Sequence, residues 1–120
     1  MNQKIQIIED NLQNMYMLTY LLESNNYVVF QSFNGMDGIA LAKEIKPDAI
    51  LLDIQLPEMD GYTVARELRK NAELKNTPII AVTSYAMTGD KEKAFESGAT
   101  GYIEKPIDPD TFISQLQAFI

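Results

Sequence analysis

Short apolar runs alternate five times with helical patterns along this chain, and no other property narrows the possible folds as far. Each run is rich in β-branched residues, and we predict a strand from each. The first, third and fourth runs are apolar at nearly every position, which is typical of strands covered on both faces in a parallel sheet. The predicted strands are Ile5–Ile8, Tyr27–Phe33, Ala49–Leu52, Pro78–Val82 and Gly101–Ile103.

Apolar residues recur at helical spacing between and after these runs. Local signals agree, because Asn or Asp stands at the expected N-caps, Pro109 stands at a first helical position and Gly98 at a C-cap. The predicted helices lie around Leu12–Leu22, Ile39–Ile45, Tyr62–Leu68 and Phe112–Ile120, with a weaker, charged helix over Thr88–Glu96. The predicted N-caps are Asn11, Asn34, Asp60 and Asp108.

Five βα units in succession predict an α/β domain with a parallel sheet and right-handed crossovers. The chain has 120 residues, a length typical of one domain. That length can bury a core without disulfides or structural metals. No linker or low-complexity stretch interrupts the alternation, so we predict a single domain over residues 1–120.

Two residue types are missing from the chain, and their absence removes whole classes of chemistry. There is no cysteine and no histidine, which excludes thiol nucleophiles, thiolate zinc sites, disulfides, catalytic imidazoles and an internal phosphohistidine. The 17 acidic and 10 basic residues give a net charge of −7, which argues against direct nucleic-acid binding. No apolar run approaches the ~20 residues of a membrane span, and no signal peptide is evident, so we expect a cytoplasmic protein with no membrane partner.

Polar residues follow four of the predicted strands, at the edge where α/β sheets bind ligands. They are Glu9 and Asp10, Asp53, Thr83, and Lys105. Taken singly, they are explained as a helix cap, a turn residue or a solvated charge. Together, three carboxylates, a hydroxyl and a lysine predict a site for a hard divalent cation, best Mg²⁺, beside a carboxylate that can accept a phosphoryl group.

Five motifs, in order and at βα spacing, carry a resemblance to a known family. They are Glu9-Asp10-Asn11, Asp48–Asp53, Leu56–Gly61, Ala81–Thr83 and Gly101–Pro106. Over its whole length the chain resembles the receiver domain of two-component response regulators. The resemblance implies a flavodoxin-like (βα)5 three-layer sandwich with a five-stranded parallel sheet of order 2-1-3-4-5. Residues 9–15 and 86–90 are most similar to single-domain regulators of the DivK type and to receivers of hybrid kinases.

The resemblance also implies roles for the polar residues at the strand ends. Asp53 is the expected phosphoacceptor. Asp10, Asp53 and the backbone carbonyl of Gln55 are the expected Mg²⁺ ligands, and Glu9 is expected to act through a metal-bound water. Thr83 is expected to hydrogen-bond the phosphoryl group and to move toward it.

Further roles follow from the same resemblance. Lys105 is expected to pair with the phosphoryl oxygens, and its bond to Pro106 is expected to be cis, a conformation essentially confined to proline. Tyr102 is the aromatic residue whose inward rotation accompanies the shift of Thr83. Gln55 and Tyr85 flank the path of the hydrolytic water and are expected to set the lifetime of the phosphoryl group.

Two positions depart from the common pattern of the family. Glu9 stands where many members have a second aspartate, and the longer side chain is expected to function. Ser84 stands where alanine is commoner, and it either crowds the phosphoryl site or adds a hydrogen bond.

These features predict a phosphorylation switch rather than a metabolic enzyme. The donor is expected to be the phosphohistidine of a sensor histidine kinase or of a histidine phosphotransfer protein, and the domain catalyses its own phosphorylation and dephosphorylation. The aspartyl phosphate is expected to bias the surface formed by the fourth and fifth βα units toward a downstream protein partner. The chain is either a stand-alone receiver or a piece of a longer regulator.

Other functions fit the residues less well. A phosphate sink, or a protein-binding module of the same fold that never turns over phosphate, remains the main alternative; loss of an acid, Thr83 or Lys105 would favour the module, but all are present. A phosphatase of the haloacid-dehalogenase type needs a second aspartate at position 55, which is Gln55. Flavin mononucleotide binding needs a hydroxyl- and glycine-rich loop after the first strand, where Glu9 and Asp10 would repel phosphate.

Overall fold

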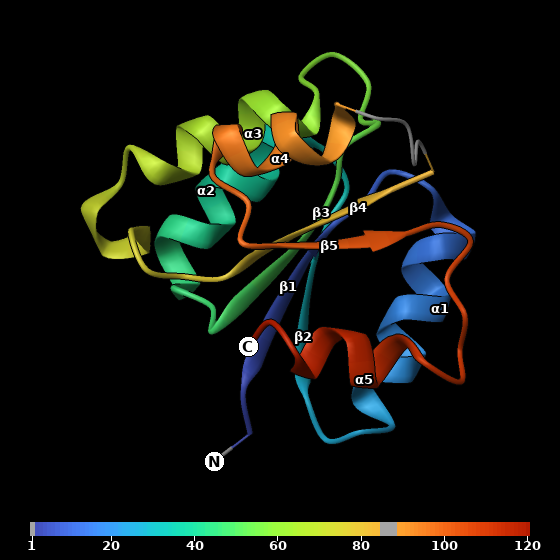
Figure 1. Cartoon of the computed structure of the whole chain (residues 1–120). Coiled ribbons are helices and arrows are strands. Elements are labelled where there is room, and N and C mark those ends of the chain that lie inside the picture. The colour runs from blue at the N-terminus through green and yellow to red at the C-terminus, as the bar shows by residue number, and fades with distance from the viewer. Residues whose placement is uncertain (1, 85–88) are drawn as a thin grey trace.

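Five parallel strands form one sheet at the centre of the molecule (Figure 1). The computed structural model describes residues 2–84 and 89–120. The sheet order is β2-β1-β3-β4-β5, which confirms the predicted topology. The strands are β1 (Lys4–Ile8), β2 (Val28–Ser32), β3 (Ala49–Asp53), β4 (Ile79–Thr83) and β5 (Gly101–Glu104).

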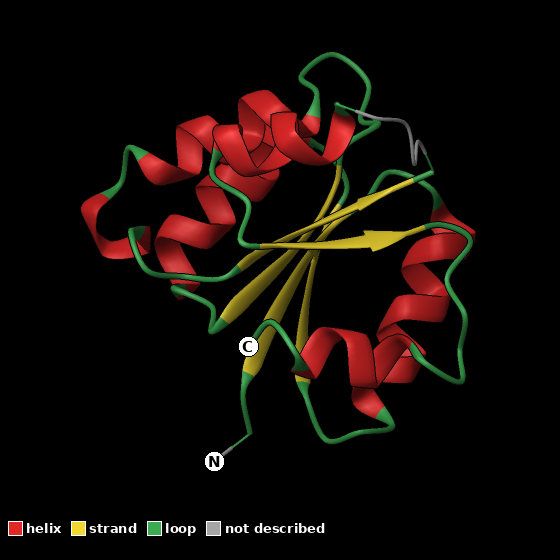
Figure 2. Ribbon diagram, viewed as in Figure 1, coloured by secondary structure: helices red, strands yellow, loops and turns green. Residues whose placement is uncertain are grey.

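Helices cover both faces of this sheet and complete a three-layer sandwich (Figure 2). Helices α1 and α5 pack on one face, and α2, α3 and α4 pack on the other. The helices are α1 (Leu12–Glu23), α2 (Gly35–Ile45), α3 (Gly61–Arg69), α4 (Asp90–Ser97) and α5 (Phe112–Gln117), with a 3₁₀ turn η1 (Ala72–Leu74) after α3. No described helix is long and apolar enough to cross a membrane.

Three of the four predicted N-caps are confirmed. The side chains of Asn11, Asn34 and Asp60 each accept a hydrogen bond from the backbone N–H three residues further on, which satisfies a donor that the first helical turn leaves unpaired. At the other end of α4, Gly98 has a φ of 121°, and its N–H donates to the carbonyl of Phe95 at 3.1 Å. The predicted C-cap at Gly98 is therefore also confirmed.

The prediction that Asp108 caps the last helix is wrong. Its Oδ1 accepts from the N–H of Asp110 at 3.0 Å, two residues on rather than three, and its carbonyl accepts from Thr111 and Phe112. This Asx-type turn satisfies the aspartate locally. Helix α5 therefore starts only at Phe112, with Thr111 at the N-cap position.

The two faces of the sheet carry separate apolar clusters. Residues of β3 and β4 are buried throughout, as expected for central parallel strands. Among the three helices on its face of the sheet, α4 buries the fewest residues, Ala94 and Ser97. It therefore has fewer buried residues holding it in place than α2 or α3 if it shifts.

Candidate active site

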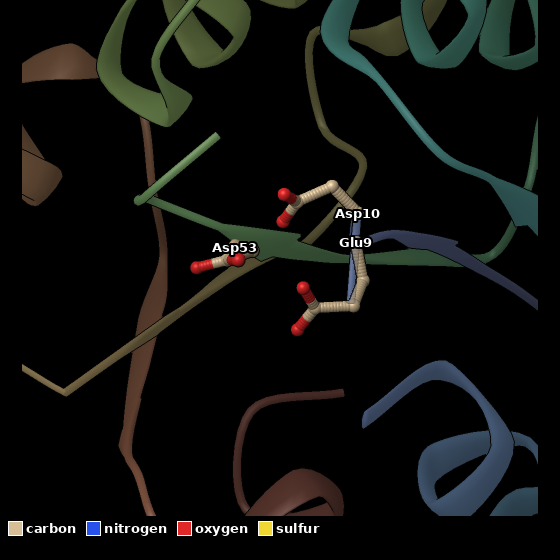
Figure 3. Close-up of side chains that lie close together, drawn as sticks. All are labelled: Glu9, Asp10 and Asp53. Atoms are coloured by element: carbon tan, nitrogen blue, oxygen red, sulfur yellow. The ribbon is translucent and has the colours of Figure 1, made fainter. Parts of the chain in front are cut away.

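The carboxylates of Glu9, Asp10 and Asp53 meet at the carboxyl edge of the sheet (Figure 3). Strands β1 and β3 are neighbours, and Ile8 pairs with Leu52, so the residues that follow this pair lie side by side. One carboxylate oxygen from each of the three acids lies within 4.8 Å of those of the other two. Glu9 and Asp53 are buried, whereas Asp10 is exposed.

Among the described residues, Lys105 brings a positive charge to this site. Its Nζ lies 3.2 Å from Oε1 of Glu9 and 3.3 Å from Oδ1 of Asp53. The backbone N–H of Lys105 donates to the carbonyl of Thr83 at 2.7 Å, which ties the end of β5 to the end of β4. The bond from Lys105 to Pro106 is cis, as the family resemblance implied.

Burial raises the pKa of Glu9 to about 7. Loss of hydration is the main cause, and the neighbouring carboxyl of Asp53 adds to it. The N–H of Asn11, which donates to Oε2 of Glu9 at 3.1 Å, and the charge of Lys105 oppose the shift. The site thus holds more acidic groups than one lysine can offset, so a carboxyl group is kept partly protonated near neutral pH.

The donor set fits a hard divalent cation. Carboxylate oxygens are the ligands that Mg²⁺ prefers, and one or two carboxylates with retained waters are its usual protein environment. Oε1 of Glu9 is buried and receives no hydrogen bond from the described residues, because the contact with Lys105 lacks hydrogen-bond geometry. A cation, or water held by a cation, would satisfy that oxygen and offset the mutual repulsion of the acids.

The remaining predicted residues lie around this group. Thr83 is buried at the end of β4, where Val82 pairs with Asp53. Tyr102 is half-buried on β5 and packs against the cluster under α2, α3 and α4, and burial together with the charge of Glu104 raises its pKa. Tyr85 lies outside the described residues.

Gln55 and Ser84 make contacts that the sequence left open. The N–H of Gln55 donates to Oδ1 of Asp53 at 3.0 Å. The hydroxyl of Ser84 donates to Oε1 of Gln55 at 2.7 Å, so the serine forms a hydrogen bond in this site. Sequence reasoning raised this possibility for Ser84 but had no signal for its partner, which lies 29 residues away.

A groove beside the acids extends toward α3 and α4. Its volume is about 530 Å³, and its polar lining includes Asp10, Gln55, Asp60 and Asp90. Asp60 is already engaged as the cap of α3, because its Oδ1 accepts from the N–H of Thr63 at 2.9 Å. The groove leaves the acidic site open to solvent on the side of Asp10.

The strand order, the three acids and the lysine define a class of signalling domain. The chain belongs to the response regulator receiver domain family, whose match covers residues 5–117. It is 40% identical to the polar-differentiation response regulator DivK of Brucella anthropi, over 100% of this chain and 98% of that protein. The DivK protein of Brucella ovis is 39% identical over the same shares.

Solved structures agree with this assignment. Chemotaxis protein CheY4 of Vibrio cholerae superposes with a TM-score of 0.96 at 27% identity, over 100% of both chains. The receiver domain of the sensor histidine kinase PA1611 of Pseudomonas aeruginosa superposes with a TM-score of 0.90 at 34% identity, over 99% of this chain and 98% of that one. That neighbour was solved with a magnesium ion coordinated in its active-site cleft.

Proposed function

We propose that this single receiver domain accepts a phosphoryl group on Asp53 and acts as a signalling switch. One observation carries the proposal. Asp53 is a buried carboxylate at the end of β3 that contacts a lysine and lies within a group of three acids. A buried carboxylate needs partners that offset its charge, and Lys105 together with a bound cation would provide them.

The phosphoryl group comes from a phosphohistidine on a sensor histidine kinase or a phosphotransfer protein, because this chain has no histidine of its own. A carboxylate oxygen of Asp53 forms a bond to phosphorus, the N–P bond of the donor breaks, and its electron pair returns to the imidazole. The product is an acyl phosphate on Asp53.

The residues around Asp53 then have distinct tasks. Asp10, Asp53 and the backbone carbonyl of Gln55 would hold Mg²⁺, and Glu9 would act through a water of that ion. When bound, Mg²⁺ offsets the charge that develops on the phosphoryl oxygens. Lys105 gives up its contacts with the carboxylates to pair with the same oxygens.

Thr83 and Tyr102 connect this chemistry to the surface. Thr83 hydrogen-bonds the phosphoryl group, and Tyr102 turns inward as Thr83 shifts. Helix α4, which buries only two residues, then shifts its position with them. The surface of β4, α4, β5 and α5 thereby changes its affinity for a downstream protein.

Labelling with a small phosphodonor tests the proposal. Incubation with acetyl phosphate and Mg²⁺ is expected to add one phosphoryl group to the wild-type protein, and excess chelator is expected to prevent it. The matched variant Asp53→Asn keeps the shape of the side chain but lacks the nucleophilic carboxylate, so it is expected to stay unlabelled. Equal labelling of wild type and Asp53→Asn in intact-mass spectra would refute the assignment.

A further inference from the structure

A hydrogen bond joins two loops at the mouth of the acidic site. The hydroxyl of Ser84 donates to Oε1 of Gln55 at 2.7 Å, and the N–H of Ser84 approaches the same oxygen at 3.4 Å. Gln55 belongs to the loop after β3, and Ser84 to the loop after β4. We refer to this contact as the Gln55–Ser84 bridge.

Both residues of the bridge lie close to the site of the proposed phosphoacceptor. Gln55 follows Asp53 by two residues, and its own N–H is bonded to Oδ1 of Asp53 at 3.0 Å. Ser84 directly follows Thr83, the last residue of β4. Strands β3 and β4 are paired neighbours up to Asp53 and Val82, so the bridge connects the chain just beyond their ends.

We infer that Ser84 is a positioning residue that prolongs the life of the aspartyl phosphate by occupying the carboxamide oxygen of Gln55. This inference deepens the proposed function and rests on it. The Gln55 oxygen has two acceptor lone pairs, and it accepts from both the hydroxyl and the N–H of Ser84, so neither lone pair is left for water. The remaining polar group of the side chain, Nε2, can only donate.

The reaction that this arrangement slows is hydrolysis of the acyl phosphate. The oxygen of a water molecule forms a bond to phosphorus, the bond from phosphorus to the Asp53 oxygen breaks, and its electron pair returns to the carboxylate. Both protons of the water stay on the phosphate oxygens, and inorganic phosphate leaves as H2PO4⁻. A glutamine side chain that is free to orient the attacking water accelerates phosphoryl transfer to water, as in GTPases. In this chain the bridge keeps Gln55 from that task.

Removal of the Ser84 hydroxyl tests the inference directly. The protein is phosphorylated with acetyl phosphate and Mg²⁺, the donor is removed by desalting, and the decay of the phosphorylated mass is followed. Ser84→Ala is expected to decay about five-fold faster, which corresponds to the loss of one ordinary hydrogen bond. Ser84→Thr keeps the hydroxyl and is expected to restore the slow decay. Ser114→Ala, an exposed serine change on α5, serves as the matched control.

Repeating the measurement in a Gln55→Ala background distinguishes an effect of Ser84 on Gln55 from a direct effect of Ser84 on the phosphoryl site. If Ser84 acts through Gln55, then Ser84→Ala has no effect on the decay rate once Gln55 is alanine. An equal acceleration in both backgrounds would show that Ser84 acts by itself, and would overturn the inference. An unchanged decay rate of Ser84→Ala would overturn it as well.

The bridge also has a readout that needs neither phosphate nor metal. In the unphosphorylated protein, the side-chain amide signals of Gln55 in ¹⁵N spectra are expected to move in Ser84→Ala and to stay near their wild-type positions in Ser84→Thr. Unmoved signals in Ser84→Ala would show that the bridge is absent in solution. A wild type that takes no label on Asp53 would instead refute the proposed function, so the two failures are distinguishable.

Discussion

The ammonium of Lys105 lies 3.2 Å from Oε1 of Glu9, and their side chains are 15% and 2% exposed. A mostly buried lysine thus faces an acid that has almost no access to water. The same ammonium lies 3.3 Å from Oδ1 of Asp53, so it is shared between two carboxylates. This sharing places Lys105 beside the proposed phosphoacceptor before any phosphoryl group arrives.

Loss of the Lys105 charge should destabilise the protein. In Lys105→Met the stem remains, but the buried carboxylates lose their cation, and we expect the free energy of unfolding to fall by about 1–3 kcal/mol. Urea denaturation in chelator at neutral pH measures the change. Lys70→Met is the control, because Lys70 pairs with Glu67 on an exposed surface and should change stability by less than about 1 kcal/mol. Equal effects of the two variants would contradict the account.

The raised pKa of Glu9 predicts a pH dependence of stability without metal. Because the folded state keeps the Glu9 proton up to about pH 7, whereas the ordinary value is 4.5, folded wild type binds more protons than unfolded chain in this window. The contribution of the Glu9 carboxyl to stability is complete below pH 4.5 and is lost as the pH rises toward 7.

The neutral variant Glu9→Gln lacks this loss. In chelator, the unfolding free energy of Glu9→Gln minus that of wild type should therefore increase as the pH rises from 4.5 to 7. Near pH 4.5 the two proteins should have similar unfolding free energies. Urea titrations at several pH values measure the difference. A difference that shrinks over this range would show that Glu9 is not desolvated as the structure has it.

Mg²⁺ should stabilise the folded protein, because it binds an assembled acidic site and not the unfolded chain. At about ten times the Kd, this linkage adds about 1.4 kcal/mol to the unfolding free energy. Asp53→Asn should stabilise the metal-free protein, since it removes one of three adjacent carboxylates, and should weaken the response to Mg²⁺. Thermal melts with and without millimolar Mg²⁺ test both statements, and a wild-type melt that does not move would contradict a metal site.

The response to phosphorylation should extend beyond the acids into residues 84–106. Helix α4 buries only Ala94 and Ser97, while its C-terminal end is held by Arg69, whose guanidinium donates to the carbonyl of Gly98 at 2.7 and 2.9 Å. Amide shifts or hydrogen exchange after addition of a beryllofluoride mimic measure the response, with Asp53→Asn as the control. Changes confined to the loops of Asp10 and Asp53 would identify a phosphate sink instead of a switch.

Much of this fold was predictable because its signals are local or periodic. Apolar runs gave the five strands, and the caps at Asn11, Asn34 and Asp60 form within one helical turn. Parallel strand ends must meet at one edge, so Glu9 and Asp53 could be expected to lie close together.

Other features depend on choices that the sequence pattern does not encode. The side chain of Asp108 could accept from the N–H two residues on, forming a turn, or three residues on, capping a helix, and it forms the turn. The partner of Ser84 lies in a different loop, 29 residues earlier, and is brought near only by the pairing of β3 with β4. Such contacts follow from the folded geometry, not from residue spacing.

The most direct test of the account is to locate the phosphoryl group within the chain. Borohydride reduces an aspartyl phosphate to homoserine, so treatment of the labelled protein followed by peptide mass mapping marks the acceptor residue. Homoserine is expected at position 53 in wild type and nowhere in Asp53→Asn. Homoserine at position 10, a reduced glutamyl product at position 9, or labelling that survives in Asp53→Asn would contradict it.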